Sequence, residues 1–127
     1  MNLIILLIIV DIVPLGLLLL GGIYETKHSK FPNTKIGYKN KYSILNKKTW
    51  EYSNKLASKI YGAIGSFLLV LNTIGIFIFG EEAFSTILAL TFILVVIARL
   101  IIENIIKKKF KLKWILKYWQ YTQITIS

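Results

Sequence analysis

Three long apolar runs dominate the chain, at residues 2–23, 56–79 and 83–106. Each is longer than the roughly 20 residues that a helix needs to cross the hydrocarbon core of a bilayer. Unpaired peptide groups are costly in lipid, so such a segment crosses as a helix, whose backbone hydrogen bonds are internal. The pattern therefore predicts an all-α protein, built as a three-helix transmembrane bundle.

The polar stretches divide the chain further and orient it. We expect residues 1–106 to form one membrane module with a cytoplasmic segment at 24–55, followed by a basic aromatic tail at 107–127. Nine lysines lie between Tyr24 and Lys59 and six lie in the tail, whereas the link at 80–82 has none. Because positive charge is retained on the cytoplasmic side, the N-terminus is expected outside the cell and the C-terminus inside.

Composition supports this interpretation: 55% of the residues are hydrophobic, 17% are charged, and the net charge is +10. An ordinary soluble domain is roughly 45–50% apolar and 25% charged, and disorder requires low hydrophobicity. Basic residues that flank apolar spans indicate orientation in a membrane rather than direct nucleic-acid binding. The absence of cysteine excludes disulfides and thiolate chemistry. The first run lacks a basic start and a small-residue cleavage site, so we expect it to be retained.

The segment at 24–55 carries signals of local structure. Residues 31–34, with the sequence Phe-Pro-Asn-Thr, predict a turn. Asn46 is a candidate N-cap for a helix that runs into the second span. Trp50 and Tyr52 fall where that helix would enter the bilayer interface, a level that amphipathic rings prefer.

The same segment contains a motif, which consists of Ile36-Gly37-Tyr38-Lys39-Asn40, Ser43, Asn46, Trp50 and Ser53-Asn54. In these residues the chain resembles the SdpI family of small bacterial membrane proteins. The resemblance implies a multi-pass protein of the bacterial cell membrane, with the motif before its second helix. The family is named for a longer immunity protein that protects a toxin-producing bacterium from its own secreted toxin and signals to a transcriptional repressor. Lys39 and Ser58 depart from the arginine and glycine common in the family, and lysine lacks the bidentate fork of arginine.

Two interpretations of the motif are open. Gly37 allows a turn with positive φ or a close approach, which would place Tyr38 and Lys39 near the lipid headgroups. Lys39, Trp50 and Asn54 would then form a site for an anion or a partner, since Trp50 and Asn54 share one helix face. The alternative, which we favour, is an interface anchor whose rings and lysine reach the headgroups.

Asp11 lies inside the first apolar run, where a carboxylate is costly and marks a candidate functional site. At about 1.5 Å per residue it reaches the same depth as Asn72, Thr73 and Thr91. Pro14 removes an N–H and leaves a carbonyl without its helical partner near that layer. The layer is either a polar pocket for a peptide, ion or lipid, or a protonated Asp11 hydrogen-bonded for packing alone, which we favour slightly.

Two further patterns lie in the second and third runs. Ser58, Gly62 and Ser66 repeat at every fourth position, and such small-residue faces let helices approach closely in lipid. We expect this face to make an internal contact rather than to join two copies of the chain. Arg99 and Glu103 are one helical turn apart and predict an ion pair.

In the tail, lysines alternate with apolar and aromatic residues between positions 109 and 118. A period of two fits an extended segment better than a helix, although a short interfacial helix remains an alternative. In either form, lysine beside tryptophan indicates attachment to the anionic inner leaflet.

Catalytic motifs are absent from the sequence: it has no nucleophile elbow, P-loop, zinc-protease motif or dinucleotide fingerprint. We therefore expect no enzyme, cofactor or metal site, and we interpret His28 as a solvated loop residue. The favoured function is a toxin-immunity or sensor protein whose partners are a secreted peptide toxin and a cytoplasmic regulator. The alternatives are a small transporter or channel, which requires a homo-oligomer, and an accessory lipid-binding subunit.

Overall fold

The computed structural model describes residues 2–126, and in that range it is helical and contains no strand. Its elements are α1 (Leu3–Thr26), α2 (Lys47–Phe79), the 3-10 turn η1 (Gly80–Ala83) and α3 (Phe84–Ile126). Residues 27–46, called the motif loop below, connect α1 to α2. The all-α expectation is confirmed.

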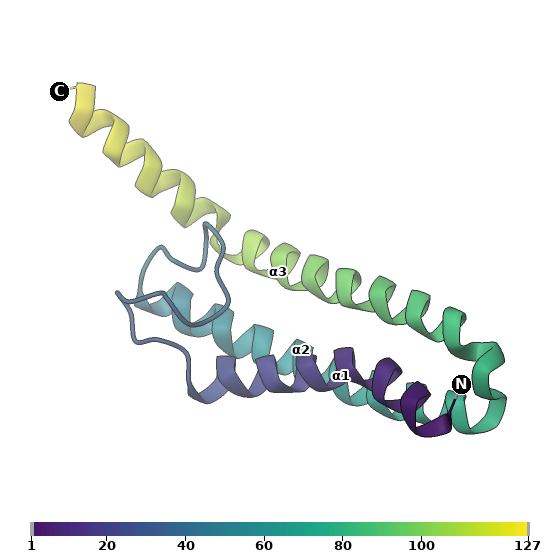
Figure 1. The fold of residues 1–127 in the computed structure, drawn as a ribbon. Coiled ribbons are helices and arrows are strands. Elements are labelled where there is room, and N and C mark those ends of the chain that lie inside the picture. The colour runs from purple at the N-terminus through teal and green to yellow at the C-terminus, as the bar shows by residue number, and fades with distance from the viewer. Residues whose placement is uncertain (1, 127) are drawn as a thin grey trace.

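The helices form a hairpin pair and a long returning arm (Figure 1). α1 and α2 lie side by side, and η1 turns the chain back into α3 close to the N-terminus. The motif loop lies at the opposite end, beside the middle of α3. Two helical stretches are long and apolar enough to cross a membrane, Leu3–Thr26 and Lys47–Gln120, and the second includes α2, η1 and most of α3.

Small residues bring α1 and α2 into close contact. A Cβ atom added at Gly21 would lie 3.1 Å from the Ser58 carbonyl oxygen and 3.2 Å from the Gly62 nitrogen. The expected internal contact of the small-residue face is therefore confirmed for Ser58 and Gly62, with α1 as the partner. Ser66 is exposed instead, and Gly65 is the buried residue. A strict four-residue spacing drifts by about 40° per step around a helix of 3.6 residues per turn, so Ser66, the third residue of the repeat, leaves the interface.

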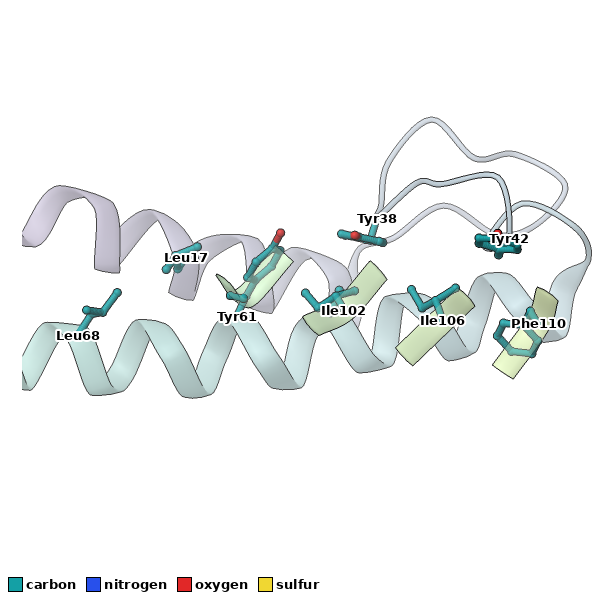
Figure 2. Packing of buried hydrophobic residues seen from close by; sticks show 10 residues of the cluster. Leu17, Tyr38, Tyr42, Tyr61, Leu68, Ile102, Ile106 and Phe110 are labelled. Carbon is teal, nitrogen blue, oxygen red and sulfur yellow. The ribbon is translucent and has the colours of Figure 1, made fainter. Parts of the chain in front are cut away.

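α3 joins the core through residues spaced every fourth position. Ala98, Ile102, Ile106 and Phe110 are all buried. Figure 2 shows the last three in a row, with Tyr38 and Tyr42 of the motif loop beside them, and all belong to one apolar cluster. The end of α3 beyond residue 106 is thus held against the motif loop.

The tail is helical, so the preference for an extended segment was wrong. Residues 107–126 continue α3 without a break. Extending a formed helix avoids the cost of nucleation. The side chains that pack against the rest of the protein, Ile106, Phe110 and Trp114, repeat every four positions rather than every two. Phe110 packs edge-on against Tyr52 at 5.4 Å between ring centroids, and Trp114 packs against Tyr42 at 6.2 Å.

Local signals in the motif loop are confirmed. Asn46 caps α2: its side chain accepts a hydrogen bond from the Thr49 N–H, and Thr49 Oγ1 accepts one from the Asn46 N–H. The expected turn closes through the Asn33 N–H and the Lys30 carbonyl, at 3.0 Å. These contacts fix where α2 begins and how the loop approaches it.

Candidate functional site

A buried polar layer joins the three helices in the half of the molecule near η1. Asn72 Nδ2 donates to the Val10 carbonyl at 2.9 Å and to Thr91 Oγ1 at 3.0 Å. Val10 lies four residues before Pro14, so its carbonyl is the one that the missing proline N–H leaves free. The sequence placed these residues at one depth, and the structure brings Asn72 and Thr91 into direct contact.

Asp11 belongs to the same layer. Thr73 Oγ1 donates to Asp11 Oδ2 at 2.8 Å. The other carboxylate oxygen, Oδ1, is buried and has no hydrogen-bond partner among the described residues. A buried acceptor without a donor is costly, so Asp11 retains the capacity to receive a hydrogen bond from an incoming group.

A cavity of about 220 Å³ opens between α2 and α3 beside this layer. Asn72 lines it, together with Thr86 and with apolar and small residues of α2, η1 and α3: Leu71, Gly75, Phe79, Ala83, Ile87 and Leu90. A mostly apolar cavity with one convergent amide is typical of a site that binds an amphipathic ligand.

The second candidate region is the motif loop, whose glycine fits a narrow space. Gly37 has φ +144°, and a Cβ there would lie 2.5 Å from Asn54 Oδ1 and 2.7 Å from Trp50 Cζ2. The Tyr38 N–H donates to Asn54 Oδ1 at 2.9 Å, and Trp50 Nε1–H donates to the Ser29 carbonyl at 2.7 Å. The close approach predicted for Gly37 is therefore present, and its neighbours are Trp50 and Asn54.

This geometry changes the interpretation of the motif. Trp50 and Asn54 are completely buried, so the favoured interpretation of Trp50 as a headgroup anchor is wrong. The Trp50 indole N–H already has its hydrogen-bond acceptor inside the protein, the Ser29 carbonyl of the motif loop. Lys39 is exposed, so it does not share a surface with Trp50 and Asn54, and an anion site built from all three stays a prediction.

Glu103 of α3 holds the motif loop from the other side. Its carboxylate accepts hydrogen bonds from the Tyr38 hydroxyl and, at 2.9 Å, from Asn40 Nδ2. The expected ion pair with Arg99 is confirmed at 3.6 Å, and the Arg99 guanidinium lies 5.5 Å from the centroid of the Tyr38 ring. Burial and the adjacent Glu103 carboxylate raise the pKa of the Tyr38 hydroxyl above its usual value.

Some functional contacts escaped the sequence interpretation. Glu103 was paired only with Arg99, and its bonds to Tyr38 and Asn40 connect residues more than 60 positions apart. No helical period relates a loop to a distant helix, so no signal pointed to them. His28 is half-buried rather than solvated, with its Nδ1 2.6 Å from the Tyr24 carbonyl. Among the described residues, no group of three or more His, Asp or Glu could hold a metal ion.

Comparison with known proteins places this geometry in a family. The comparisons with curated proteins and with solved structures returned no match. A model of the SdpI/YfhL protein family matches residues 30–102, which include most of the motif loop, all of α2 and the part of α3 that carries Thr91 and Arg99. This chain belongs to the SdpI/YfhL protein family.

Proposed function

We propose that the chain crosses a bacterial cell membrane three times, with α1, α2 and the first part of α3 as the spans. The two lysine blocks support one orientation, because they lie at the same end: Lys117 Nζ donates to the Leu45 carbonyl of the motif loop at 3.0 Å. The η1 turn at the other end carries Glu81 and Glu82 and no lysine. Positive charge stays on the cytoplasmic side, so the motif loop is inside and η1 is outside.

Within that frame, the protein acts as a non-enzymatic immunity or sensor protein that binds a secreted antimicrobial peptide. The observation that supports this proposal most strongly concerns Asp11. Its Oδ1 is buried in the outer polar layer and accepts no hydrogen bond from the described residues. An ammonium, guanidinium or amide N–H of a peptide would supply the missing donor. Family membership supports an immunity-type membrane role.

The cytoplasmic partner in this proposal is a regulator that contacts the motif loop. α3 connects the two regions, because Thr91 contacts the outer layer and Glu103 contacts the loop. A peptide that displaces α3 at the outer layer would therefore change the contacts of Tyr38 and Asn40. The regulator would detect peptide binding through this change in the motif loop.

The test is protection of a peptide-sensitive bacterial strain that expresses the full chain. Asp11→Asn keeps the size of the side chain and an acceptor for Thr73 but replaces the second carboxylate oxygen with an NH2 group, which cannot accept a hydrogen bond. Because a buried donor left without its acceptor costs about 1–3 kcal/mol, we expect this variant to lower the tolerated peptide concentration by about tenfold. Glu82→Gln is the matched control, since it removes one negative charge from the exposed η1 turn.

Equal protection by the wild type, Asp11→Asn and Glu82→Gln would contradict a role for Asp11. Absence of protection by a correctly inserted wild type against peptides encoded beside its gene would contradict immunity itself. The oligomeric transporter or channel loses part of its support, because the backbone of Ser58 and Gly62 lies against Gly21 of α1.

A further inference from the structure

A second cavity, of about 550 Å³, lies at the opposite end of the molecule from the outer layer, where α1 ends and α2 begins. Its lining contains two acidic residues, two lysines, a histidine and three small residues: Glu25, Glu51, Lys55, Lys59, His28, Ser58, Gly62 and Ala63. Neither the polar layer nor the Glu103 contacts use these side chains. The cavity is therefore separate from the sites described above.

The charges around this cavity are not neutralised by one another. Glu51 and Lys55 are spaced i,i+4 on α2 with the acid first, which is the orientation that pairs best on a helix. Even so, within the part of the chain that the structure describes, the recorded ion pair is Arg99–Glu103. Two carboxylates and two ammonium groups thus face one space without internal partners.

The order of the groups along α2 is specific. Gly62 and Ala63 lie nearest the middle of the span, Lys59 and Lys55 follow, and Glu51 lies nearest the start of the helix. Four residues correspond to about 6 Å along a helix. From the apolar side outward, the cavity presents small residues, then positive charge, then negative charge.

We propose that this cavity binds the headgroup of a phospholipid that carries a primary ammonium group. The acyl chains and glycerol lie over Gly62 and Ala63, the phosphate contacts Lys55 and Lys59, and the ammonium contacts Glu25 and Glu51. The arrangement rests on the membrane orientation proposed above, because only that orientation brings inner-leaflet headgroups to this end. It does not depend on peptide binding.

The experiment uses the full chain in detergent and measures the thermal midpoint during titration with short-chain phospholipids. The probes are dihexanoyl phosphatidylethanolamine, phosphatidylcholine and phosphatidylglycerol, together with soluble O-phosphoethanolamine. We expect phosphatidylethanolamine to bind most tightly, because choline cannot donate a hydrogen bond and glycerol carries no positive charge. O-Phosphoethanolamine, which lacks the acyl chains, binds more weakly than the corresponding lipid.

Paired variants separate the two halves of the site. Lys55→Gln with Lys59→Gln should weaken binding of all three lipids, by roughly fivefold for each lysine removed. Glu25→Gln with Glu51→Gln should remove only the preference for phosphatidylethanolamine over phosphatidylglycerol. The matched control is Lys47→Gln with Lys48→Gln, two exposed lysines on the same helix that do not line the cavity.

Several outcomes would overturn the assignment. One is equal affinity for the three lipids, and another is an equal loss in the Lys47 and Lys48 control, which would indicate general charge attraction. Equal affinity for O-phosphoethanolamine and the lipid would assign the site to a soluble ligand. Membrane insertion of each variant is scored separately by resistance to alkaline extraction, and its orientation by whether trypsin added outside sealed, right-side-out vesicles leaves the motif loop uncleaved, so a failure of the orientation is distinguishable from a failure of the lipid site.

Discussion

The Tyr38 hydroxyl donates a hydrogen bond to the carboxylate of Glu103, which joins the motif loop to the middle of α3. The same carboxylate accepts a bond from Asn40 and pairs with Arg99. One side chain of α3 therefore holds the loop in place.

Glu103→Ala should release the motif loop without unfolding the helices. Because two loop hydrogen bonds to a charged acceptor are lost, we expect tryptic cleavage at Lys35, Lys39 and Lys41 to accelerate by about tenfold, as local opening becomes easier. The measurement is limited proteolysis in detergent followed by mass spectrometry. Asn104→Ala, at the exposed neighbouring position, is the control and should cleave at the wild-type rate.

Gly37→Ala should destabilise the protein markedly. The position has φ +144°, and the added Cβ would overlap Asn54 and Trp50, so backbone strain of about 1–3 kcal/mol is added to a steric clash. The thermal midpoint in detergent measures the effect. Gly22→Ala adds the same methyl group where no side chain and no other element of the structure lies within 4 Å; a comparable loss there would show that the loop geometry is not the cause.

Asn72→Leu should cost about 1–2 kcal/mol, because the Val10 carbonyl and Thr91 lose their donor in an apolar surrounding. Pro14→Ala restores a backbone N–H for that carbonyl. In the double variant the loss from Asn72→Leu should therefore shrink, which a double-mutant cycle of thermal stability measures. Strict additivity of the two changes would mean that Asn72 does not serve the carbonyl that Pro14 leaves free.

Gly65→Leu should separate α1 from α2. Even a Cβ at this position lies 3.0 Å from the Pro14 carbonyl oxygen and 3.1 Å from Leu17 Cβ, and overpacking costs about 1–3 kcal/mol. Gly16→Leu, where a Cβ meets nothing within 4 Å, provides the comparison. The thermal midpoints of both variants are measured in the same detergent. An equal loss in the two variants would contradict the close contact between α1 and α2 at Gly65.

The Tyr38 hydroxyl should make stability depend on alkaline pH. Its pKa is raised by burial first and by Glu103 second, so the neutral form is favoured in the folded state. A group with a raised folded pKa stabilises fully below its unfolded value of about 10, and the contribution is lost as pH rises above it. Midpoints between pH 8 and pH 11 should fall less steeply for Tyr38→Phe than for the wild type; parallel curves would exclude this contribution.

Much of the polar layer was predictable because it depends on depth alone. A helix rises by a constant amount per residue, so the positions of Asp11, Asn72 and Thr91 in antiparallel helices could be compared by counting. The carbonyl freed by Pro14 followed from the chemistry of proline. The actual donor, Asn72, required the rotation of α2 about its axis, which depends on the glycine contacts with α1.

The motif loop was predictable only in its local parts. The Asn46 cap and the turn at Lys30–Asn33 arise from neighbouring residues. By contrast, Trp50 is buried with its indole N–H bonded to the carbonyl of Ser29, 21 positions earlier, a contact that no local pattern predicts. The tail was misjudged because alternation over a few residues hid the four-residue repeat that leads from Ile106 through Phe110 to Trp114.

Because α3 is one continuous helix, a rotation of the helix at one end displaces the residues at the other end. Its contact with the polar layer at Thr91 and its contacts at the motif-loop end, at Glu103 and Phe110, lie on one helix. Along the axis, Glu103 is about 18 Å and Phe110 about 28 Å from Thr91. A tilt of about 5° about Thr91 would move Glu103 by roughly 1.6 Å and Phe110 by roughly 2.5 Å. The first displacement already exceeds the range over which a hydrogen bond survives. A small change in the angle of α3 at the polar layer would thus break the hydrogen bonds that hold the motif loop.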